Sequence, residues 1–280
     1  MTVLVTGATG RVGSRFVPRL VGWGLRVRVL VRDAARVRGL VDLGTEVVEG
    51  DITDAGARVR AVEGVEAVVN VAAAFRGVSD EHAVDVNRHA AVGLAEAALD
   101  AGVRRFVHTS TGLVYPGGLG RPAAETDEPA SGGTHVYPVS KAAADRALVE
   151  LHRTRGLPLR IARLAFVYGE GDPHLAESHR FIADWSSAKR LHMVHHADVG
   201  QALLRMATAD GLDGAVVNVA DDAPTTAWEL ARLTGRSAPV RNEPVADAWE
   251  SVLDTTRFRT VLGLRPLFPT VHTAVDAGAL

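Results

Sequence analysis

Short runs of apolar, mostly β-branched residues alternate along the chain with longer segments in which apolar residues return every three or four positions. The short runs predict strands near 2–6, 26–31, 46–49, 67–72, 105–109, 159–167 and 215–219. The longer segments predict helices near 12–22, 56–63, 82–101, 137–154, 197–209, 226–234 and 254–262. Strands that alternate with helices are typical of a parallel sheet covered by helices on both faces, so we predict a doubly wound α/β fold.

The composition narrows the classes of function. The 280 residues carry a net charge of −2, which offers no basic field for nucleic acid and no polybasic face for a membrane. Cysteine is absent, so disulfides, thiol nucleophiles and Cys-based metal sites are excluded. No apolar run reaches the ~18 residues of a membrane span, and a strand that starts at residue 2 leaves no room for a signal peptide. We expect a cytoplasmic protein with no nucleic-acid and no membrane partner.

A glycine-rich turn joins the first predicted strand to the first predicted helix. Gly7 suits a tight turn, Gly10 lets the backbone approach a pyrophosphate, and Gly13 lets the helix pack closely on the strand. The N-terminus of the helix then offers free N–H groups to phosphate oxygens. A tight turn without a ligand can carry the same glycines, but their place between strand and helix favours dinucleotide binding. The predicted cofactor contacts in this turn are Gly7, Thr9, Gly10, Arg11, Val12 and Gly13.

Tyr137 and Lys141 stand four residues apart in a predicted helix, which places both side chains on one helix face. A tyrosine hydroxyl has an ordinary pKa of ~10, too high for proton transfer at neutral pH. A cation beside it stabilises the phenolate and lowers that pKa. A Tyr and a Lys on the protein surface can have the same spacing. The pair therefore indicates a catalytic site only in combination with the glycine turn. Pro138 is tolerable only within the first turn of this helix.

Together these segments resemble the extended branch of the short-chain dehydrogenase/reductase superfamily, the NAD(P)-dependent epimerase, dehydratase and ketoreductase type. Six segments match the motifs of that branch in its order: 6–13, 50–54, 70–73, 107–115, 163–169 and 254–266. The resemblance implies a Rossmann-type doubly wound parallel sheet with a small C-terminal substrate-binding region. The implied Rossmann domain comprises 1–167 and 195–222, and the small region comprises 168–194 and 223–280.

The resemblance also implies a role for each matching residue. Tyr137 would be the general acid/base, and Lys141 would lower its pKa and hydrogen-bond the nicotinamide ribose. Thr111, with Ser110 as the reserve candidate, would hydrogen-bond the substrate oxygen. Asn87 would order the site, as a structural or a relay residue. Further implied cofactor contacts are Asp51 at the adenine, Ile52, Val71, Ala72, Ala73, Asn87 and Leu164.

The residue after the second predicted strand bears on the choice of cofactor. An acid at this place bonds the ribose 2′-hydroxyl and favours NAD, whereas an arginine accommodates the 2′-phosphate of NADP. Arg32 takes this place, and Asp33 follows it, so a strand end shifted by one residue would reverse the choice. The residues 30–33 resemble the dihydroflavonol-reductase type, which uses NADPH. We therefore predict NADPH/NADP as the cofactor, with NAD as the alternative.

The predicted function is the NADPH-dependent reduction of a carbonyl on a small, largely hydrophobic substrate, such as a polyketide, flavonoid-like or terpenoid ketone. One alternative is an NAD-dependent nucleotide-sugar epimerase, which the short segment between 169 and 195 and its few cations disfavour. Another is a non-catalytic dinucleotide-sensing regulator, which the retention of Thr111, Tyr137 and Lys141 disfavours. Dehydratases of this branch carry Asp-Glu where this chain has Gly112-Leu113, so dehydration is also disfavoured.

The remaining expectations concern partners and the pocket. The histidines lack the spacing of a zinc site, so we predict no metal. We expect a monomer or homodimer that binds a small-molecule carbonyl substrate. Five aromatic residues could wall an apolar pocket or pack in the core: Trp185, Trp228, Trp249, Phe166 and Phe181.

Overall fold

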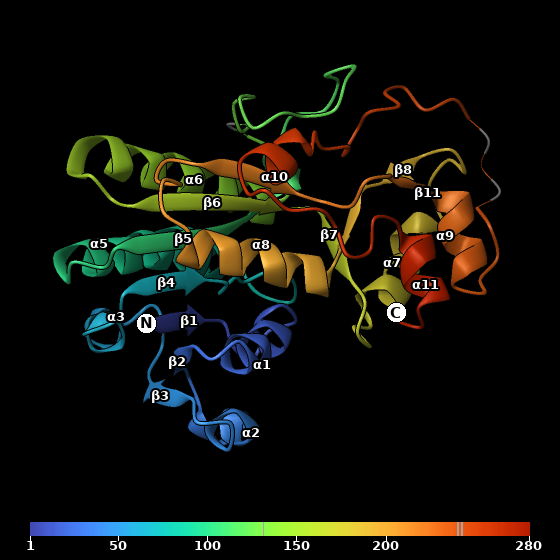
Figure 1. Ribbon diagram of the computed structural model, residues 1–280. Helices are drawn as coiled ribbons and strands as arrows, with labels where there is room; N and C mark the ends of the chain where they lie inside the picture. The colour runs from blue at the N-terminus through green and yellow to red at the C-terminus, as the bar shows by residue number, and fades with distance from the viewer. Residues whose placement is uncertain (131, 240, 242) are drawn as a thin grey trace. The chain divides into compact units, whose positions relative to one another are not determined.

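The computed structural model describes residues 1–130, 132–239, 241 and 243–280 (Figure 1). The strands are β1 Thr2–Thr6, β2 Arg26–Val31, β3 Glu46–Glu49, β4 Ala67–Asn70, β5 Arg105–Thr111, β6 Leu159–Leu164, β7 Phe166–Tyr168, β8 Arg190–Leu191, β9 Met193–His195, β10 Val216–Val219 and β11 Thr225–Thr226. The α-helices are α1 Gly13–Gly22, α2 Arg38–Val41, α3 Ala55–Val62, α4 Asp80–Val84, α5 Ala91–Asp100, α6 Val136–Arg155, α7 His174–Ile182, α8 His196–Thr208, α9 Ala227–Leu233, α10 Thr256–Thr260 and α11 Val271–Asp276. Three further helical turns are η1 Ala34–Val37, η2 Asp85–Ala90 and η3 Gly112–Val114.

Seven strands form one sheet in the order β10-β6-β5-β4-β1-β2-β3. β1 pairs in parallel with both β2 and β4, β2 pairs in parallel with β3, and β4 with β5. The order therefore reverses between β1 and β4, as in a Rossmann fold, and the predicted fold class is confirmed. In open α/β sheets, ligands generally bind outside the carboxyl ends of the strands at such a reversal.

The chain forms two compact units, of which the first comprises 1–114, 130–162 and 203–216. Its core contains apolar side chains from β1, β4 and β5 and from the helices α3, α5 and α6, including Leu4, Val68, Leu94, Phe106 and Leu148. All five are fully buried. Figure 1 shows α5 and α6 beside the strands of this unit. Strands buried on the helix-covered faces explain why the sequence shows continuous apolar runs rather than strict alternation.

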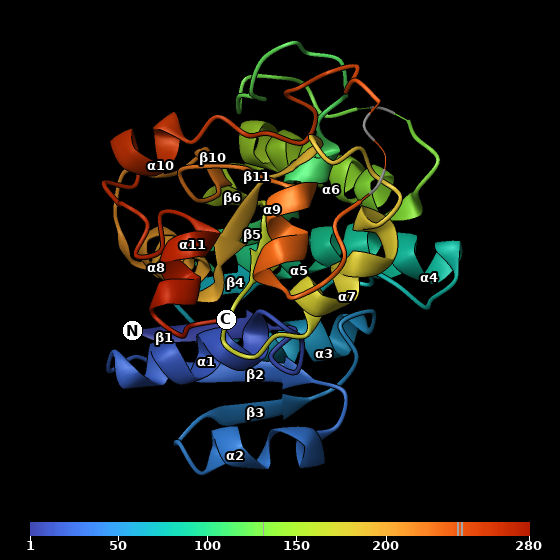
Figure 2. The ribbon, with the colours of Figure 1, turned by 90° about the vertical axis from the view of Figure 1, so that its right-hand side faces the viewer.

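The second unit comprises 115–129, 163–202 and 217–280. It contains the parallel pair β7–β9 and the antiparallel pair β8–β11. Its core joins Tyr168 to apolar residues of α7, α9 and α11 (Figure 2), including Leu175, Leu230 and Val271. The predicted domain boundaries stay a prediction.

One predicted strand is divided in the structure. The sequence predicted a continuous strand over 159–167, but β6 ends at Leu164 and β7 starts at Phe166. The N–H of Ala165 still donates to Val219 of β10, whereas the N–H of Phe166 donates to His192 beside β9. The backbone therefore changes hydrogen-bonding partners at this point, and the apolar run in the sequence does not reveal such a change.

The predicted helix over 82–101 is also more complex than its periodicity suggested. It consists of α4, the π-helical turn η2 and α5, and Asn87 lies in the π-helical turn. Such turns are rare and often lie at functional sites.

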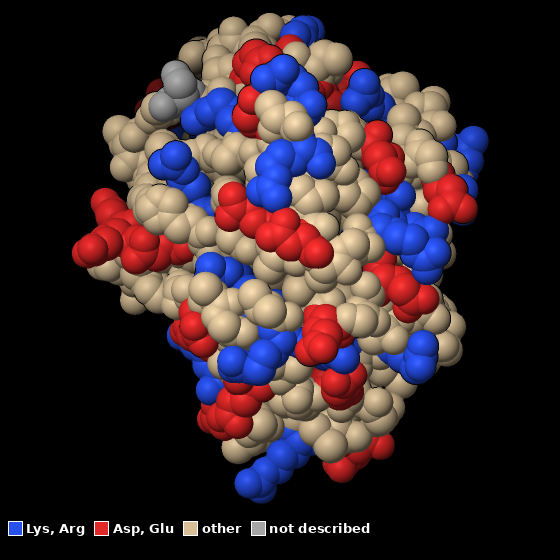
Figure 3. All heavy atoms as spheres, turned by 90° about the vertical axis from the view of Figure 1, so that its left-hand side faces the viewer, with Lys and Arg blue, Asp and Glu red and all other residues tan. Residues whose placement is uncertain are grey.

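The surface and the helices bear on the expected partners. Figure 3 shows Lys and Arg side chains interspersed with Asp and Glu on one face. Across the described residues, no helix is long and apolar enough to span a membrane.

Candidate active site

The glycine turn after β1 is shaped by two close backbone contacts. Gly7 has a φ of +69°, and a Cβ on it would lie 2.7 Å from the backbone nitrogen of Ala72. A Cβ on Gly13 would lie 2.2 Å from the carbonyl oxygen of Gly7. Neither position accepts a side chain without movement of the backbone. The turn thus lies directly against the segment that follows β4, where the strand order reverses, and both segments belong to the first unit.

Within this turn, Thr9, Gly10 and Arg11 are exposed, and the N–H of Gly10 donates to the oxygen of Gly7. Val12 is the N-cap residue of α1. Helix α1 therefore starts beside exposed residues, so its first N–H groups can be reached by a phosphate. The structure brings these predicted cofactor contacts together with Val71, Ala72 and Ala73, the residues after β4.

A second group of predicted cofactor contacts follows β2 and β3. β2 ends at Val31, so Arg32 is the first residue after the strand, and its side chain is exposed. Asp33 is already used as a helix cap, because its carboxylate accepts the N–H of Ala35 at 2.9 Å.

Asp51 lies near Arg32. Burial raises the pKa of Asp51, but the backbone and hydroxyl hydrogen bonds from Thr53, at 2.8 Å each, and the positive charge of Arg32 outweigh it and hold that pKa below its ordinary value. Ile52 follows Asp51 and packs partly against the core of this unit. A cation and a carboxylate that stays ionised therefore stand together after β2 and β3.

Tyr137 lies in the first turn of α6, where its hydroxyl meets Thr111 at the end of β5. Burial raises the pKa of Tyr137 to about 12, and the hydrogen bond from Thr111 opposes that rise. The Thr111 oxygen also accepts the N–H of Leu113 at 3.2 Å, which leaves its hydroxyl hydrogen for Tyr137. Phe75 packs its ring against Tyr137 edge-on, with centroids 4.5 Å apart. Pro138 is in the first turn of α6, as predicted.

Lys141 has a different partner from the one its spacing suggested. Its Nζ lies 3.0 Å from Nε2 of His108 on β5, and both side chains are fully buried. Among the described residues, Lys141 makes no hydrogen bond to Tyr137. Burial lowers the pKa of Lys141 to about 8, and the carboxylate of Asp145 one turn further along α6 opposes that change. The ammonium is therefore held at the face of the sheet.

Asn87 ties two parts of the site together. Its side chain accepts the N–H of Ala74 and donates to the oxygen of the same residue, both at 2.8 Å. It also donates to the hydroxyl of Ser140 at 3.0 Å, and Ser140 donates to the oxygen of Tyr137. Both amide hydrogens of Asn87 are used. The side chain thus clamps the segment after β4 to the first turn of α6.

Ser110 is buried, and its hydroxyl makes no hydrogen bond to any described residue. It alternates with Thr111 along β5, so the two side chains point to opposite faces of the strand. Thr111, and not Ser110, therefore stands beside Tyr137. The structure adds His108, Phe75 and Leu113 to the residues around the predicted site. His108 lay unmarked in the matched segment 107–115, whereas no sequence signal distinguished Phe75.

Leu164, the remaining predicted cofactor contact, ends β6 and belongs to the second unit. Three histidines of that unit contact other residues of the unit. Nε2 of His196 lies 2.8 Å from Asp172, and His195 faces the oxygen of Ala279. His192 accepts the N–H of Leu253.

The five aromatic residues named from the sequence also lie in the second unit. Phe166, Phe181 and Trp185 pack against its core. Trp228 and Trp249 are exposed, with the guanidinium groups of Arg232 and Arg190 over their rings.

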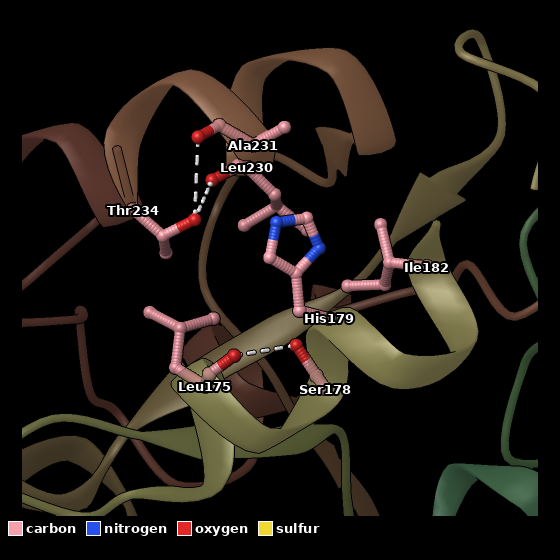
Figure 4. Close-up of a pocket in the computed structure, with 7 residues that line it drawn as sticks. All are labelled: Leu175, Ser178, His179, Ile182, Leu230, Ala231 and Thr234. Carbon is pink, nitrogen blue, oxygen red and sulfur yellow. Dashed lines mark hydrogen bonds between the residues drawn. The ribbon is translucent and has the colours of Figure 1, made fainter. Parts of the chain in front are cut away.

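A small pocket lies between α7 and α9 of the second unit (Figure 4). Its lining residues are Leu175, Ser178, His179, Ile182, Leu230, Ala231 and Thr234. The hydroxyl of Ser178 donates to the oxygen of Leu175, and that of Thr234 donates to the oxygen of Leu230. Both hydroxyls are used within their own helices, so we assign this pocket no ligand.

Comparison with known proteins gives one family. The model of the NAD dependent epimerase/dehydratase family matches residues 3–220. The chain is 34% identical over 196 residues to sterol demethylase protein B of Methylococcus capsulatus, a match that covers 68% of this chain and 58% of that protein. The chain thus spans little more than half the length of this relative.

Two further similarities are to proteins whose names refer to different small molecules. The chain is 28% identical over 246 residues to a 4-hydroxy-2-methyl-3-oxo-4-farnesyl-3,4-dihydroquinoline-1-oxide ketoreductase of Stigmatella aurantiaca, with 80% of this chain and 69% of that protein covered. Among solved structures, MoeE5 in complex with UDP-glucuronic acid and NAD superposes with a TM-score of 0.81 at 25% identity, with 99% of this chain and 97% of that chain covered.

Proposed function

The chain belongs to the NAD dependent epimerase/dehydratase family, of the extended short-chain dehydrogenase/reductase type, and from this premise we propose that it reduces a carbonyl group with NADPH. The observation that carries the proposal is the contact between the hydroxyls of Tyr137 and Thr111 at the carboxyl end of β5. Tyr137 is protonated at neutral pH: its ordinary pKa of ~10 already lies well above 7, and burial raises that pKa to about 12. A protonated phenol is the form that can donate to a carbonyl oxygen as hydride reaches the carbon.

The residues of the first unit suit a nicotinamide dinucleotide. The glycine turn and the start of α1 would hold the pyrophosphate, with Val71, Ala72 and Ala73 along the cofactor. Asp51 would bond the adenine, and Lys141 the nicotinamide ribose. The bound dinucleotide supplies the hydride; the chain's own residues orient it and provide the proton.

Arg32 supports NADPH over NADH. It is exposed directly after β2, the place that faces the ribose 2′-position in Rossmann proteins. The competing acid, Asp33, is occupied as the cap of η1. A guanidinium offers fork-shaped charged donors to a 2′-phosphate.

Arg32→Ala should therefore erase most of a preference for NADPH that we expect to be roughly tenfold or more, given ~1.5–3 kcal/mol for a hydrogen bond to a charged group. The measurement is kcat/KM with each cofactor. Arg36→Ala, on the neighbouring turn η1, is the control and should leave the preference in place. Better use of NADH than of NADPH by the wild-type protein would contradict the assignment.

The substrate we propose is uncharged and largely apolar. Phe75 and Leu113 are 41% and 51% exposed, although they adjoin the Tyr137–Thr111 pair. Large apolar side chains at a reacting centre favour apolar ligands. The names of two relatives, which refer to a sterol and to a farnesyl-bearing dihydroquinoline, support the same class. Neither Gly112 nor Leu113 can supply the acid of a dehydratase.

Phe75→Ala should raise KM for an apolar ketone by about tenfold or more, because burial of a Phe side chain contributes ~1.5–3 kcal/mol. The effect on kcat should be smaller. Trp23→Ala removes another exposed aromatic, at the end of α1, and should leave KM unchanged. An unaltered KM in the Phe75 variant would mean that this ring does not face the substrate.

The function itself is tested by oxidation of NADPH against a panel of apolar ketones, with UDP- and dTDP-sugars as the opposing panel. Turnover of the ketones is the expected result. Micromolar affinity for a nucleotide sugar, with NAD retained through turnover, would replace the reductase by the epimerase.

A further inference from the structure

Four buried side chains form a continuous hydrogen-bonded chain in the first unit. The hydroxyl of Thr6 lies 2.6 Å from Oδ1 of Asn70, and Nδ2 of Asn70 lies 3.2 Å from Nδ1 of His108. Nε2 of His108 lies 3.0 Å from Nζ of Lys141. None of the four is more than 1% exposed. This hydrogen-bonded network thus runs across β1, β4 and β5 and ends on α6. It has no gap that a water molecule would have to fill.

The charge of Lys141 dictates where the hydrogens of this chain lie. An ammonium has three hydrogens and no acceptor, so it can only donate. A charged Lys141 therefore needs the lone pair of Nε2, which puts the imidazole hydrogen of His108 on Nδ1. Nδ1–H in turn needs the amide oxygen of Asn70. A neutral Lys141 allows the opposite arrangement, with the imidazole hydrogen on Nε2 and the Asn70 nitrogen at Nδ1.

The two arrangements occupy the same space. They differ by a reversal of the Asn70 amide, whose oxygen and nitrogen are nearly identical in shape. Thr6 can serve both, because a hydroxyl donates to Oδ1 in one and accepts from Nδ2 in the other. Both arrangements keep the contacts from Thr6 through Asn70 and His108 to Lys141, and they are distinguished by the protonation of Lys141.

We propose that His108 is a positioning residue for Lys141: as a neutral imidazole it binds one ammonium hydrogen and leaves the other two available to the cofactor ribose. This inference rests on the proposed function for the use made of Lys141. It goes beyond that function in assigning His108 the task of keeping the ammonium charged and in place.

The surrounding charges are consistent with a neutral His108. Burial and the charge of Lys141 hold the pKa of His108 well below its ordinary value. Among the described residues, the carboxylate of Asp145 on α6 faces this pair, with Oδ1 3.9 Å from Nε2 of His108. Asp145 favours the charged lysine, whereas burial disfavours it. The hydrogen bond to His108 also favours the charged form of Lys141, as Asp145 does, because the bond is made to that form.

The far end of the chain reaches the proposed cofactor site. The Thr6 oxygen accepts the N–H of Ala72 at 3.3 Å, and Thr6 directly precedes Gly7. The position of the Lys141 ammonium is thereby tied to the backbone of the glycine turn and of the segment after β4. We expect that binding of the dinucleotide changes the environment of the His108 side chain through this connection.

The first test compares His108→Gln with His108→Asn. The Gln side chain can place an amide oxygen where Nε2 accepts from Lys141, whereas Asn reaches only the position of Nδ1. Loss of the acceptor should lower the pKa of Lys141. As the pH rises, the ammonium loses its proton, and the activity should then fall at a lower pH than in the wild type. We expect the alkaline limb of the kcat/KM profile to move down by about one pH unit in His108→Asn, for a lost charge-assisted bond. His108→Gln should keep the wild-type limb.

A structural role alone would change stability without moving that limb, so an unshifted profile in a folded His108→Asn protein overturns the proposal. A downward shift of equal size in His108→Gln would do the same. The pH limb is compared at saturating NADPH, with the melting temperature of each variant recorded in parallel.

The second test needs no turnover. In ¹⁵N-histidine-labelled wild-type protein, the ring nitrogen shifts of His108, assigned by their loss in His108→Gln, report which nitrogen carries the hydrogen. At about neutral pH, where Lys141 is charged, we expect the Nδ1–H form, with a change toward Nε2–H as Lys141 loses its proton. An Nε2–H form at neutral pH, or a doubly protonated ring, overturns the proposal. This readout separates it from the proposed function, since an active Tyr137→Phe protein would overturn the function alone.

Discussion

Tyr137→Phe is expected to lower kcat by ~10²–10⁴-fold, the usual loss for a positioned general acid, while the affinity for the dinucleotide stays near that of the wild type. The substitution removes one oxygen and leaves the ring against Phe75, at a centroid distance of 4.5 Å. Thr111 still accepts the N–H of Leu113, so the end of β5 keeps its local hydrogen bond. The measurements are single-turnover reduction of the ketone and NADPH binding by fluorescence.

Tyr115→Phe is the matched control. Its hydroxyl donates to Asn218 at 2.7 Å and accepts from Arg163 at 2.9 Å. The loss of these bonds should lower the melting temperature and leave most of the turnover. A Tyr137→Phe protein with wild-type kcat would show that a substrate group or a water supplies the proton.

Gly13→Ala is expected to weaken dinucleotide binding by about 10- to 100-fold, because overpacking of a close contact costs ~1–3 kcal/mol. The added Cβ would stand 2.2 Å from the Gly7 oxygen and 2.8 Å from the Cα of Ala8. The clash is with backbone, so no side-chain rotation relieves it, and the turn must open. Calorimetric titration with NADPH measures the change.

Gly22→Ala tests the same substitution at the other end of α1. A Cβ on Gly22 meets nothing within 4 Å, and alanine is the better helix former. Binding should be unchanged and stability equal or higher. Equal binding by the Gly13 and Gly22 variants would mean that the turn does not hold the pyrophosphate.

Several features of this protein were determined by local sequence. The strand and helix periods predicted the order of elements and a doubly wound α/β fold, because each period records which face of an element is buried. The glycine positions predicted the turn after β1, and the spacing of Tyr137 and Lys141 placed them on one face of α6. These features depend on the backbone within a few residues, so no distant contact was needed to find them.

The partners of those residues were decided by the tertiary structure. Lys141 meets His108, which stands 33 positions earlier in the chain, because β5 and α6 pack together. Phe75 contacts Tyr137, 62 positions later in the chain, where Asn87 ties the segment after β4 to α6. The division of the strand at Ala165 reflects a change of hydrogen-bonding partner between Val219 and His192. Buried polar side chains must find partners wherever the packed elements bring them, and that choice is made by the fold as a whole.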